Sequence, residues 1–431
     1  MLADSPALQK ALRELEALHP KKIDLGLDRI KRVLKALSHP EYSLPPTVHV
    51  AGTNGKGSTI AFLRAMAEAQ GLKVHVYTSP HLVSFRERIV LAGQMVSEDT
   101  LLAAITRVLK ANAGKPLSFF EATTAAAFLL FSETYADLLI LETGLGGRFD
   151  ATNVIDHPAS VILTPIDYDH ADFLGRDLAQ IAREKAGIFK QFSPVISAAQ
   201  APVVKAVLEQ EAHKIRTQIR FFGEDFCSYI QHERLIYEDE NALLDLPKPC
   251  LRGQHQVENA GLAIATARLL MIGDEAISEG LQTALWPARL QPLTRGKLAE
   301  PAHAHAAELW LDGGHNPHAA RALADSIAAL NARDPRPLVL IMGMLASKDA
   351  PAYLEAFKGL AAHLIAVPIP GHASLSPESL MDIAEGRGLK AHRAETLQEA
   401  VEMASGLTET PPRILICGSL YLAGEALKLA G

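Results

Sequence analysis

The sequence has little cysteine, few aromatic residues and no long apolar run. Only three cysteines occur among 431 residues, Cys227, Cys250 and Cys417, and they lie far apart in no metal-ligand spacing. We interpret them as packing residues in a reducing compartment. No apolar stretch approaches the ~20 residues that a membrane span needs. The first twenty residues carry charges throughout and lack the apolar core of a signal peptide, so we expect a cytoplasmic protein.

The chain also lacks an excess of basic residues. Lysine and arginine total 42 against 49 for aspartate and glutamate, which gives a net charge of -7. No basic surface is expected to dominate, which argues against nucleic acid as the main partner. A hydrophobic content of 48% and a charged content of 21% are typical of a globular protein, and the length allows two hydrophobic cores.

Strands alternating with helices are predicted from residue 47 onward. Before that point, 5–38 has the pattern of two amphipathic helices, which the prolines at 40, 45 and 46 end. The segment 47–52 predicts a short strand, and a glycine-rich loop separates it from a helix predicted over 58–70. This order of strand, loop and helix is typical of phosphate-binding sites.

Three further segments predict strands of the same sheet, at 73–79, 137–144 and 161–167. They are largely apolar on both faces, which indicates a parallel sheet covered by helices. From about 203 to 250 the pattern weakens, and we expect there a small β-meander or hairpin appended to this first sheet.

A second α/β domain is predicted after residue 295. A new series of apolar strands begins there, ELWLDGG, PLVLIMGM, HLIAVPI and RILICGS, with helical patterns over 318–330, 377–386 and 396–404. Pro292, Gly296 and the stretch AEPAHAHAAE mark the junction. The predicted fold class is therefore α/β, with one domain over 1–295 and a second over 296–431.

The glycine-rich loop Asn54–Thr59 is a candidate phosphate site. Backbone N–H groups and the helix N-terminus present positive potential there, and Lys56 adds a mobile charge. The usual G-x-x-x-x-G-K-[ST] pattern is not met, because Val50 and Gly57 occupy its first glycine and its Ser/Thr position. We favour nucleotide binding over a plain turn, but not a generic kinase or GTPase. Ser58 or Thr59 could reach a phosphate-bound magnesium or could simply cap the helix.

Candidate ligands follow two of the predicted strands. Glu142 ends the strand at 137–144, at the edge where open parallel sheets place ligands, and it could hold magnesium or merely cap the strand. His170 follows the next strand, although a lone histidine is more often a surface or core residue. Lys185, in REKAGIFK, would by itself be read as an exposed helix lysine.

In the second domain, Asp312 and His315 follow the strand that ends in DGGHNP. They could face the first domain, and a cleft between the two domains is the expected active site. The alternative is that Asp312 and Asn316 only cap the turn and the next helix.

The motifs in combination are specific. In order, the chain contains AGTNGKGST, YTSPHLVSFRERI, FFEATT, LETGLGGRFDATN, DHADFLG, REKAGIFK, HQVENA, WPARLQ and DGGHNPHAA. It thereby resembles the bacterial dihydrofolate synthase/folylpolyglutamate synthases of the Mur ligase superfamily, from residue 23 to residue 424. The resemblance implies an N-terminal P-loop, Mur-ligase-like ATPase domain with a parallel central sheet, and a C-terminal Rossmann-like α/β domain.

The resemblance also implies a role for each candidate residue. Catalysis would involve Lys56, Lys185 and His315. ATP would be bound by Asn54, Gly55, Lys56, Gly57, Ser58, Thr59, Asn259, Arg289 and Asp312, and magnesium by Ser79, Glu142 and His170. A pterin-bearing substrate would lie against Asp24, Leu25, Gly26, Ser118, Phe119, Phe120, Glu121, Arg148 and Phe149, although Phe120 is also a plausible core residue.

Lys185 matches a lysine that family members carbamylate, which would turn a cation into a carboxylate-like group able to help bind a second magnesium ion. The chain departs modestly from the family pattern. Gly314 stands where alanine is common, Ala288 stands where glycine is common, and TPIDYDH differs around the histidine. These differences remove no charged or ligating group, so they leave substrate preference in doubt more than catalysis.

The implied activity is an ATP- and magnesium-dependent ligase. It would activate a carboxylate as an acyl phosphate and join it to L-glutamate, with dihydropteroate, reduced folates or both as acceptors, and the second domain would close to exclude water. The partners would be small molecules, without nucleic acid or membrane, and a monomer is expected. The alternatives are another Mur-type ligase acting on a different carboxylate, and a nucleotide-dependent binding or regulatory module that ligates nothing.

Overall fold

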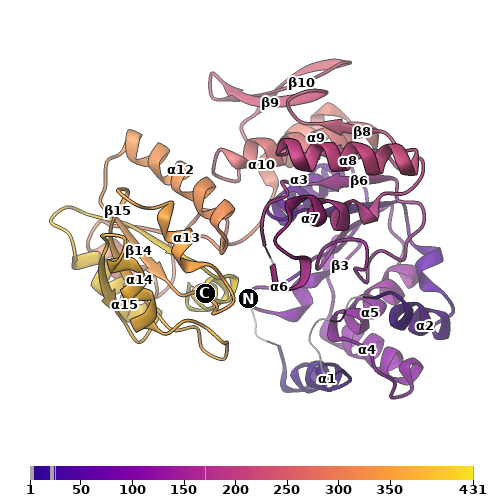
Figure 1. Ribbon diagram of the computed structural model, residues 1–431, viewed down its shortest axis with the longest axis horizontal. Coiled ribbons are helices and arrows are strands. Elements are labelled where there is room, and N and C mark those ends of the chain that lie inside the picture. The colour runs from indigo at the N-terminus through magenta and orange to yellow at the C-terminus, as the bar shows by residue number, and fades with distance from the viewer. Residues whose placement is uncertain (1–3, 20–23, 25, 170, 431) are drawn as a thin grey trace. The chain divides into compact units, whose positions relative to one another are not determined.

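The structure is a computed structural model that describes the chain except for residues 1–3, 20–23, 25, 170 and 431. Its contacts divide the chain into two compact units. The first unit comprises residues up to 250 together with 256–285, and the second comprises 251–255 with 286–431. The domain boundary predicted after residue 295 stays a prediction. Each unit is built around its own sheet (Figure 1).

An eight-stranded sheet forms the centre of the first unit. Its strands are β1 (Thr47–Ala51), β2 (Val74–Tyr77), β3 (Ile89–Leu91), β4 (Gln94–Met95), β5 (Leu138–Glu142), β6 (Ser160–Leu163), β7 (Val195–Ser197) and β8 (Ile219–Phe221). They follow the order β4-β3-β2-β5-β1-β6-β7-β8. The neighbouring strands β2, β5, β1, β6, β7 and β8 pair in parallel. At one edge of the sheet, β3 pairs antiparallel with β2, and β4 pairs antiparallel with β3. The predicted parallel central sheet is confirmed.

Helices cover this sheet, as its apolar strands require. They are α1 (Pro6–Glu16), α2 (Asp28–Ala36), α3 (Lys56–Ala69), α4 (Glu98–Asn112), α5 (Phe119–Glu133), α6 (Ala171–Leu174), α7 (Leu178–Lys185), α8 (Pro202–Ile215), α9 (His255–Leu269) and α10 (Asp274–Thr283), with short 3-10 turns at Pro40–Ser43, Phe85–Arg88 and Ala186–Ile188. One core joins α1, α2, α4 and α5 to β2 and β5, and these four helices gather together in Figure 1. Another core joins α7 and α8 to β6 and β7.

The helix α3 begins earlier than predicted. It starts at Lys56 rather than at Ser58, because Gly55 takes up the left-handed conformation (φ +90°) that ends the loop. The helix then packs closely on α10, where a Cβ on Gly280 would lie 2.4 Å from the backbone nitrogen of Met66. The end of the glycine loop and the first turn of the helix are therefore one continuous element.

The predicted meander exists but is not appended to the first sheet. Strands β9 (Phe226–Gln231), β10 (Arg234–Asp239) and β11 (Ala242–Pro247) form a separate antiparallel sheet, and the large sheet ends at β8. The inward residues Leu235 and Tyr237 are completely buried, and the Ser228 hydroxyl donates to the Val257 carbonyl oxygen of α9 (2.8 Å). The meander packs on α9 because one of its faces is apolar and is stabilised by being buried against a helix.

The hairpin between β9 and β10 offers a test of backbone strain. Both turn residues, His232 (φ +49°) and Glu233 (φ +59°), adopt the left-handed conformation that glycine tolerates best. We expect Glu233→Gly to raise the free energy of unfolding by about 0.5–1 kcal/mol in urea titrations. The control Glu238→Gly, on the exposed side of β10, should instead lower it, and a loss of stability in both variants would contradict the assignment of strain.

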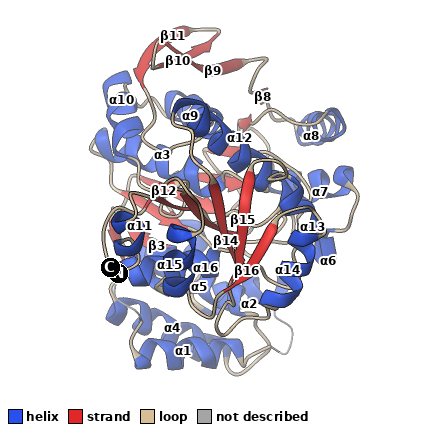
Figure 2. Ribbon diagram, turned by 90° about the vertical axis from the view of Figure 1, so that its left-hand side faces the viewer, coloured by secondary structure: helices blue, strands red, loops and turns tan. Residues whose placement is uncertain are grey.

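A six-stranded sheet forms the second unit. Its strands are β12 (Gln291–Pro292), β13 (Glu308–Leu311), β14 (Leu338–Met342), β15 (Ala361–Ala366), β16 (Lys390–Arg393) and β17 (Arg413–Cys417), in the order β12-β13-β17-β14-β15-β16. All pairs are parallel except β12 with β13. Its helices are α11 (Glu300–Ala304), α12 (Pro317–Arg333), α13 (Ala350–Glu355), α14 (Pro377–Glu385), α15 (Leu397–Gly406) and α16 (Leu420–Ala430), several of which flank the strands in Figure 2. The predicted second α/β sheet is confirmed.

No helix in the described part of the chain has both the length and the apolar character needed to cross a membrane.

A buried histidine lies in β1, two positions before the strand ends. The Nε2 atom of His49 is 2.8 Å from the hydroxyl of Thr152, which itself donates to the carboxylate of Asp150 (2.6 Å). The hydroxyl has one proton and gives it to Asp150, so His49 donates through Nε2–H. Burial, together with a smaller effect of the positive charge of Lys190, lowers the pKa of His49 to about 3. This histidine is therefore neutral in the folded protein.

We expect His49 to make the protein sensitive to acid. The unfolded chain binds a proton near pH 6.5 and the folded chain does not, so stability present above that pH is lost as the pH falls toward 3. The free energy of unfolding should drop by about 2 kcal/mol more in the wild type than in His49→Gln between about pH 7.5 and pH 5. Urea titrations at the two pH values measure this difference, and equal drops would show that His49 is not buried as a neutral group.

Candidate functional site

A cavity that is open to solvent, with about 330 Å³ of empty space including that open part, lies where β1 and β5 end in the first unit. Carboxyl ends of parallel strands are where open sheets place ligands. The lining residues are Gly52, Thr53, Lys56, Thr143, Gly144, Leu145, Gly146, Asp169, Leu174 and Lys185. The structure thus brings together the glycine loop, the segment that follows Glu142, and Lys185, which lie far apart in the sequence.

The loop between β1 and α3 depends on glycine at two positions. Gly52 (φ +143°) lies so close to β6 that a Cβ would be 1.9 Å from the hydroxyl oxygen of Thr164. Gly55 lies against α9, where a Cβ would be 2.5 Å from the Oδ1 atom of Asn259. These contacts fix the loop between β6 and α9, and they place the predicted residue Asn259 beside it.

Lys56, the first residue of α3, lies over this loop. Its ammonium group donates to the carbonyl oxygens of Gly52 (3.2 Å) and Thr53 (3.3 Å). The same group is 3.8 Å from the Oε1 atom of Glu142. With 17% of its side chain exposed, Lys56 is a cation at the edge of the cavity, next to a helix N-terminus.

Two of the three predicted metal ligands are neighbours. Glu142 is 4% exposed as the last residue of β5, and its Oε2 atom accepts a hydrogen bond from the backbone nitrogen of Ser79 (2.9 Å). The third, His170, lies outside the described residues. Carboxylate and hydroxyl oxygens are donors that magnesium prefers, so this pair fits such an ion. No group of three His, Cys, Asp or Glu side chains suited to a metal occurs among the described residues, so other oxygen ligands would have to complete the site.

Lys185 is buried, contrary to the interpretation of REKAGIFK as an exposed helix surface. It is the last residue of α7, 5% exposed, and its Nζ atom donates to the carbonyl oxygen of Gly52 (2.8 Å). Burial lowers its pKa to about 7, with Lys56 adding to the effect and Asp169 and Asp150 opposing it. A substantial part of this amine is therefore uncharged at neutral pH, which makes it nucleophilic.

The two hydroxyl residues of the loop motif do not cap the helix. Gly55 holds the N-cap position, while Ser58 and Thr59 are buried in the first turn of α3. The Ser58 hydroxyl accepts a hydrogen bond from Gln256 (3.2 Å), whose own oxygen accepts one from Asn259 (3.0 Å). The sequence analysis missed Gln256, although its position three residues before Asn259 on one helix would have indicated a shared face.

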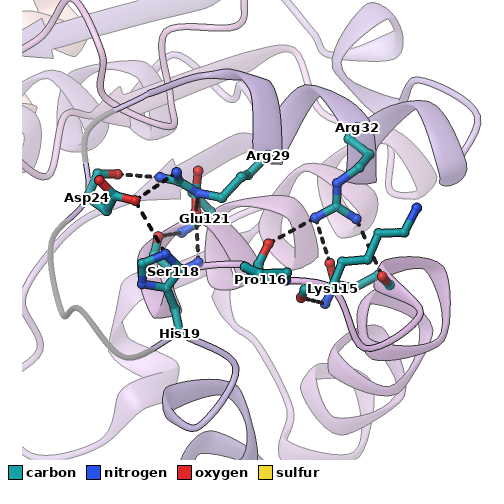
Figure 3. Close-up of polar contacts among 9 residues, drawn as sticks. His19, Asp24, Arg29, Arg32, Lys115, Pro116, Ser118 and Glu121 are labelled. Atoms are coloured by element: carbon teal, nitrogen blue, oxygen red, sulfur yellow. Dashed lines mark hydrogen bonds and ion pairs between the residues drawn. The ribbon is translucent and has the colours of Figure 1, made fainter.

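A second cluster gathers predicted substrate residues around an arginine that the sequence analysis missed (Figure 3). Arg29, in the first turn of α2, pairs with Asp24 (2.9 Å) and with Glu121 (3.0 Å). Ser118 is the N-cap of α5 and forms a capping box with Glu121. Gly26 has nothing within 4 Å of an added Cβ, and Leu25 lies outside the described residues. The adjacent carboxylates indicate a polar subsite in this part of the unit.

Aromatic rings connect that cluster with the cavity. Phe120 lies against the loop after β5, because a Cβ on Gly144 would be 2.5 Å from its Cζ atom. The Phe119 ring packs edge-on against Phe85, with 5.8 Å between the ring centres. Both Phe119 and Phe120 are only partly buried. Phe120 therefore packs against the loop after β5 but is not fully buried in the core.

Arg148 and Phe149 follow the same loop. The backbone nitrogen of Arg148 donates to the carbonyl oxygen of Glu184 (2.7 Å), and its guanidinium lies 3.5 Å from the carboxylate of that residue. Gly187 makes this approach possible, because a Cβ there would be 2.4 Å from the Cα atom of Arg148. Phe149 is 45% exposed. The contacts of Arg148 with Glu184 and Gly187 fix the loop against the end of α7, and the roles of Arg148 and Phe149 toward substrate stay predictions.

In the second unit, Asp312 organises the turn that follows β13. Its two carboxylate oxygens accept hydrogen bonds from the backbone nitrogens of Gly314 (2.7 Å) and Leu290 (2.8 Å). Asn316 caps α12 by accepting from the nitrogen of Ala319 (2.9 Å). The alternative that these two side chains act as caps is therefore confirmed, and it leaves the predicted role of Asp312 toward ATP untested.

Arg289 and His315 lie at the same turn. A Cβ on Gly313 would be 3.0 Å from the Nη1 atom of Arg289, and His315 contacts the carbonyl oxygen of Gly313 (3.3 Å). The second unit thus brings Arg289, Asp312 and His315 together. Ala288 stands at a position where the dihydrofolate synthase/folylpolyglutamate synthases commonly have glycine. Its φ of +56° lies in the left-handed region, which glycine adopts more readily than alanine.

Comparisons with known proteins agree with this geometry. Residues 50–267 match the model of the Mur ligase middle domain, and residues 300–420 match that of the Mur ligase glutamate ligase domain. The dihydrofolate synthase/folylpolyglutamate synthase of Escherichia coli K12 is 33% identical and aligns over 99% of this chain and 96% of its own. The enzyme of that name from Bacillus subtilis is 34% identical, over 94% of both chains.

Solved structures give the same result for the fold. The Escherichia coli FolC complex with DHPP and ADP superposes with a TM-score of 0.88, at 31% identity, over 99% of this chain and 98% of the other. The Yersinia pestis bifunctional folylpolyglutamate synthase/dihydrofolate synthase complexed with AMPPNP and Mn ion gives a TM-score of 0.87 at 30% identity, over 99% of each chain.

Proposed function

The chain belongs to the Mur ligase family and, within it, to the dihydrofolate synthase/folylpolyglutamate synthases, and on that basis we propose that it joins L-glutamate both to dihydropteroate and to folates. It is an ATP-dependent glutamate ligase of folate metabolism. The observation that carries the proposal is the Lys56–Glu142 ion pair next to the glycine loop, at the edge of the cavity. Phe120 links this pair to the Asp24–Arg29–Glu121 cluster in the same unit.

The reaction makes an amide from a carboxylate, which is a poor electrophile because of its resonance. A carboxylate oxygen of the acceptor attacks the γ-phosphorus of ATP, the bond to the bridging oxygen breaks, and ADP leaves. The amine nitrogen of glutamate then attacks the acyl carbon of this acyl phosphate. Inorganic phosphate leaves, and the new amide nitrogen loses its proton.

The loop residues act mainly by electrostatics. Negative charge spreads over the phosphoryl oxygens as the carboxylate approaches, and Lys56 and the backbone N–H groups at the start of α3 stabilise that charge. Glu142 keeps the lysine in place at 3.8 Å. In the second unit, we propose that Arg289 and Asp312 contribute to ATP binding and that His315 contributes to catalysis, because the three residues converge on one turn.

Magnesium belongs to the proposal. The Yersinia pestis structure, which is complexed with AMPPNP and Mn ion, supports the use of a divalent ion. In this chain Glu142 and Ser79 would hold it, with His170 as a further ligand, and it would supply positive charge to the phosphate oxygens. A second ion is also proposed, with carbamylated Lys185 helping to bind it.

Lys185 has the properties that carbamylation requires. Its uncharged amine can attack the carbon of CO₂, forming an N–C bond and releasing one proton. We expect Lys185→Ala to lower kcat by roughly 10²-fold, because the cavity loses a charged group, and we expect millimolar acetate to restore part of the rate by supplying the missing carboxylate. Phosphate release measures both effects.

Acetate should leave Lys56→Ala unchanged, since that variant lacks a cation and not an anion. Wild-type protein equilibrated with ¹³C-bicarbonate should show a carbamate carbon signal that is absent from Lys185→Ala. Equal acetate effects on both variants, without a carbamate signal, would contradict the modification.

We further propose that the protein works as a monomer in the cytoplasm, on small molecules and without nucleic acid. The net charge of -7 argues against nucleic acid as the main partner, and three cysteines without a disulfide, all of them in the described part of the chain, are typical of a reducing compartment.

The direct test is ATP- and magnesium-dependent phosphate release. Purified protein is supplied with L-glutamate and either dihydropteroate or a reduced folate monoglutamate, with Lys56→Ala as the inactive control. Release with both acceptors supports the bifunctional proposal, and release with one assigns a single activity. Release with neither would overturn it in favour of a Mur-type ligase that acts on another carboxylate.

A further inference from the structure

We infer that Arg29 is a positioning residue that holds the carboxylates of Asp24 and Glu121 in place to receive the flat heterocyclic head of the acceptor. The inference rests on the proposed function and deepens it. It adds to the acceptor subsite a residue that touches no reacting atom but sets the geometry of the residues that recognise the substrate.

The guanidinium of Arg29 uses separate edges for its two partners. The Nη1 atom is 2.9 Å from the Oδ2 atom of Asp24, and the Nε atom is 3.0 Å from the Oε2 atom of Glu121. The Nη2 atom also donates to the backbone oxygen of Asp24. A planar fork with fixed donor directions can bridge two carboxylates in a single geometry, which a lysine cannot do. Figure 3 shows the guanidinium between the two carboxylates.

Glu121 supplies a second and independent observation. It is 3% exposed, and its Oε2 atom accepts hydrogen bonds from Arg29 and from the backbone nitrogen of Ser118 (2.8 Å). Its Oε1 atom is buried and has no hydrogen-bond partner among the described residues. A buried carboxylate oxygen without a donor is costly, so an N–H group of a ligand would satisfy it.

The surroundings indicate the chemical class of that ligand. Phe119 and Phe120, the first two residues of α5, directly precede Glu121 and are only partly buried. Aromatic faces suit a flat ring, and carboxylate oxygens suit its N–H donors. The pterin head of the proposed acceptor has a flat ring and N–H donors, because its aminopyrimidinone edge carries adjacent ring N–H and amino groups.

The chain provides a matched control in Arg32, one turn further along α2. Arg32 also connects α2 to the segment before α5, through the side-chain oxygen of Asn112 (3.0 Å) and the carbonyl oxygen of Pro116 (3.0 Å). Its hydrogen-bond partners among the described residues are neutral oxygens, and neither Asp24 nor Glu121 is among them (Figure 3). Replacing Arg32 therefore removes comparable packing and hydrogen bonding without affecting the two carboxylates.

The experiment compares Arg29→Gln, Arg29→Lys and Arg32→Gln with the wild type. The readouts are kcat, the KM for dihydropteroate, the KM for ATP and the midpoint of thermal unfolding. We expect Arg29→Gln to raise the KM for dihydropteroate by about tenfold or more, because misplaced recognition groups weaken binding strongly. Its KM for ATP should stay within about twofold of the wild-type value. Arg29→Lys should give an intermediate KM for dihydropteroate, since an ammonium group can reach only one of the two carboxylates.

Arg32→Gln should lower the unfolding midpoint as Arg29→Gln does, but leave the KM for dihydropteroate unchanged. Equal KM values for dihydropteroate in the two glutamine variants, or a parallel rise in the KM for ATP, would show that Arg29 is merely structural and would overturn the inference. If Arg29→Gln does not fold, the comparison of Arg29→Lys with Arg32→Gln decides in the same way. A wild-type protein that releases no phosphate with either acceptor would overturn the proposed function, and the role of Arg29 with it.

Discussion

Replacing Lys56 by alanine is expected to lower kcat/KM for phosphate release by about 10³-fold. The ammonium group lies over the glycine loop, 3.8 Å from Glu142 and at the start of a helix, so it meets the negative charge of the transferring phosphoryl group. Removing one such preorganised charge costs about two to three orders of magnitude in comparable sites. Steady-state phosphate release with saturating glutamate measures the change.

The fold should survive this substitution, because the stem of Lys56 is partly exposed at the cavity edge. A suitable control is Lys205→Ala, which removes a partly exposed lysine of α8 paired with Glu224 (2.5 Å), and its activity should equal that of the wild type. Retention of more than about a tenth of the activity by Lys56→Ala would show that the glycine loop does not bind the reacting phosphate.

Glu142→Gln is expected to produce the second large effect. The amide oxygen can still accept the hydrogen bond from Ser79, so the local structure is kept, but the negative charge near Lys56 is lost. We expect activity to fall by about 10²–10³-fold and the magnesium concentration for half-maximal rate to rise, because a neutral amide is a weaker ligand for a divalent cation. Magnesium titrations of the phosphate-release rate measure both quantities.

The matched control is Glu133→Gln, at the exposed end of α5, where the carboxylate pairs with Arg107 (2.6 Å). Its magnesium dependence should be unchanged. If Glu142→Gln shows a lower rate but the wild-type magnesium dependence, then Glu142 only keeps Lys56 in place and is not a metal ligand.

The sheets were predictable because their strands are apolar on both faces. The prediction for β1, β2, β5 and β6 is confirmed, since buried parallel strands read as continuous runs of Val, Ile and Leu. The edge strand β16 was not predicted, because its sequence KAHR is polar and shows no such run. The meander was assigned to the wrong sheet because alternation predicts strands but not the element that covers them.

The site was predictable in part. The end of a strand located Glu142, and the loop pattern located Lys56, because both signals depend on local sequence. The burial of Lys185 was not predictable, since it results from the close approach of α7 to the carbonyl group of Gly52. Arg29 was missed for the same reason, because its partner Glu121 lies far away in the sequence. The partner of Gln256, Ser58, is also distant, but the spacing of Gln256 to Asn259 on one helix was a local signal that could have indicated it.

The central claim is that glutamate is joined to the acceptor through an acyl phosphate. The most direct test supplies dihydropteroate whose carboxylate carries ¹⁸O, together with ATP, magnesium and L-glutamate, and measures the isotope in the released phosphate by mass spectrometry. Transfer of the carboxylate oxygen to the γ-phosphorus predicts one ¹⁸O atom in each phosphate formed from doubly labelled carboxylate, with dihydrofolate as the product. Dihydrofolate formed with unlabelled phosphate would contradict the acyl-phosphate route.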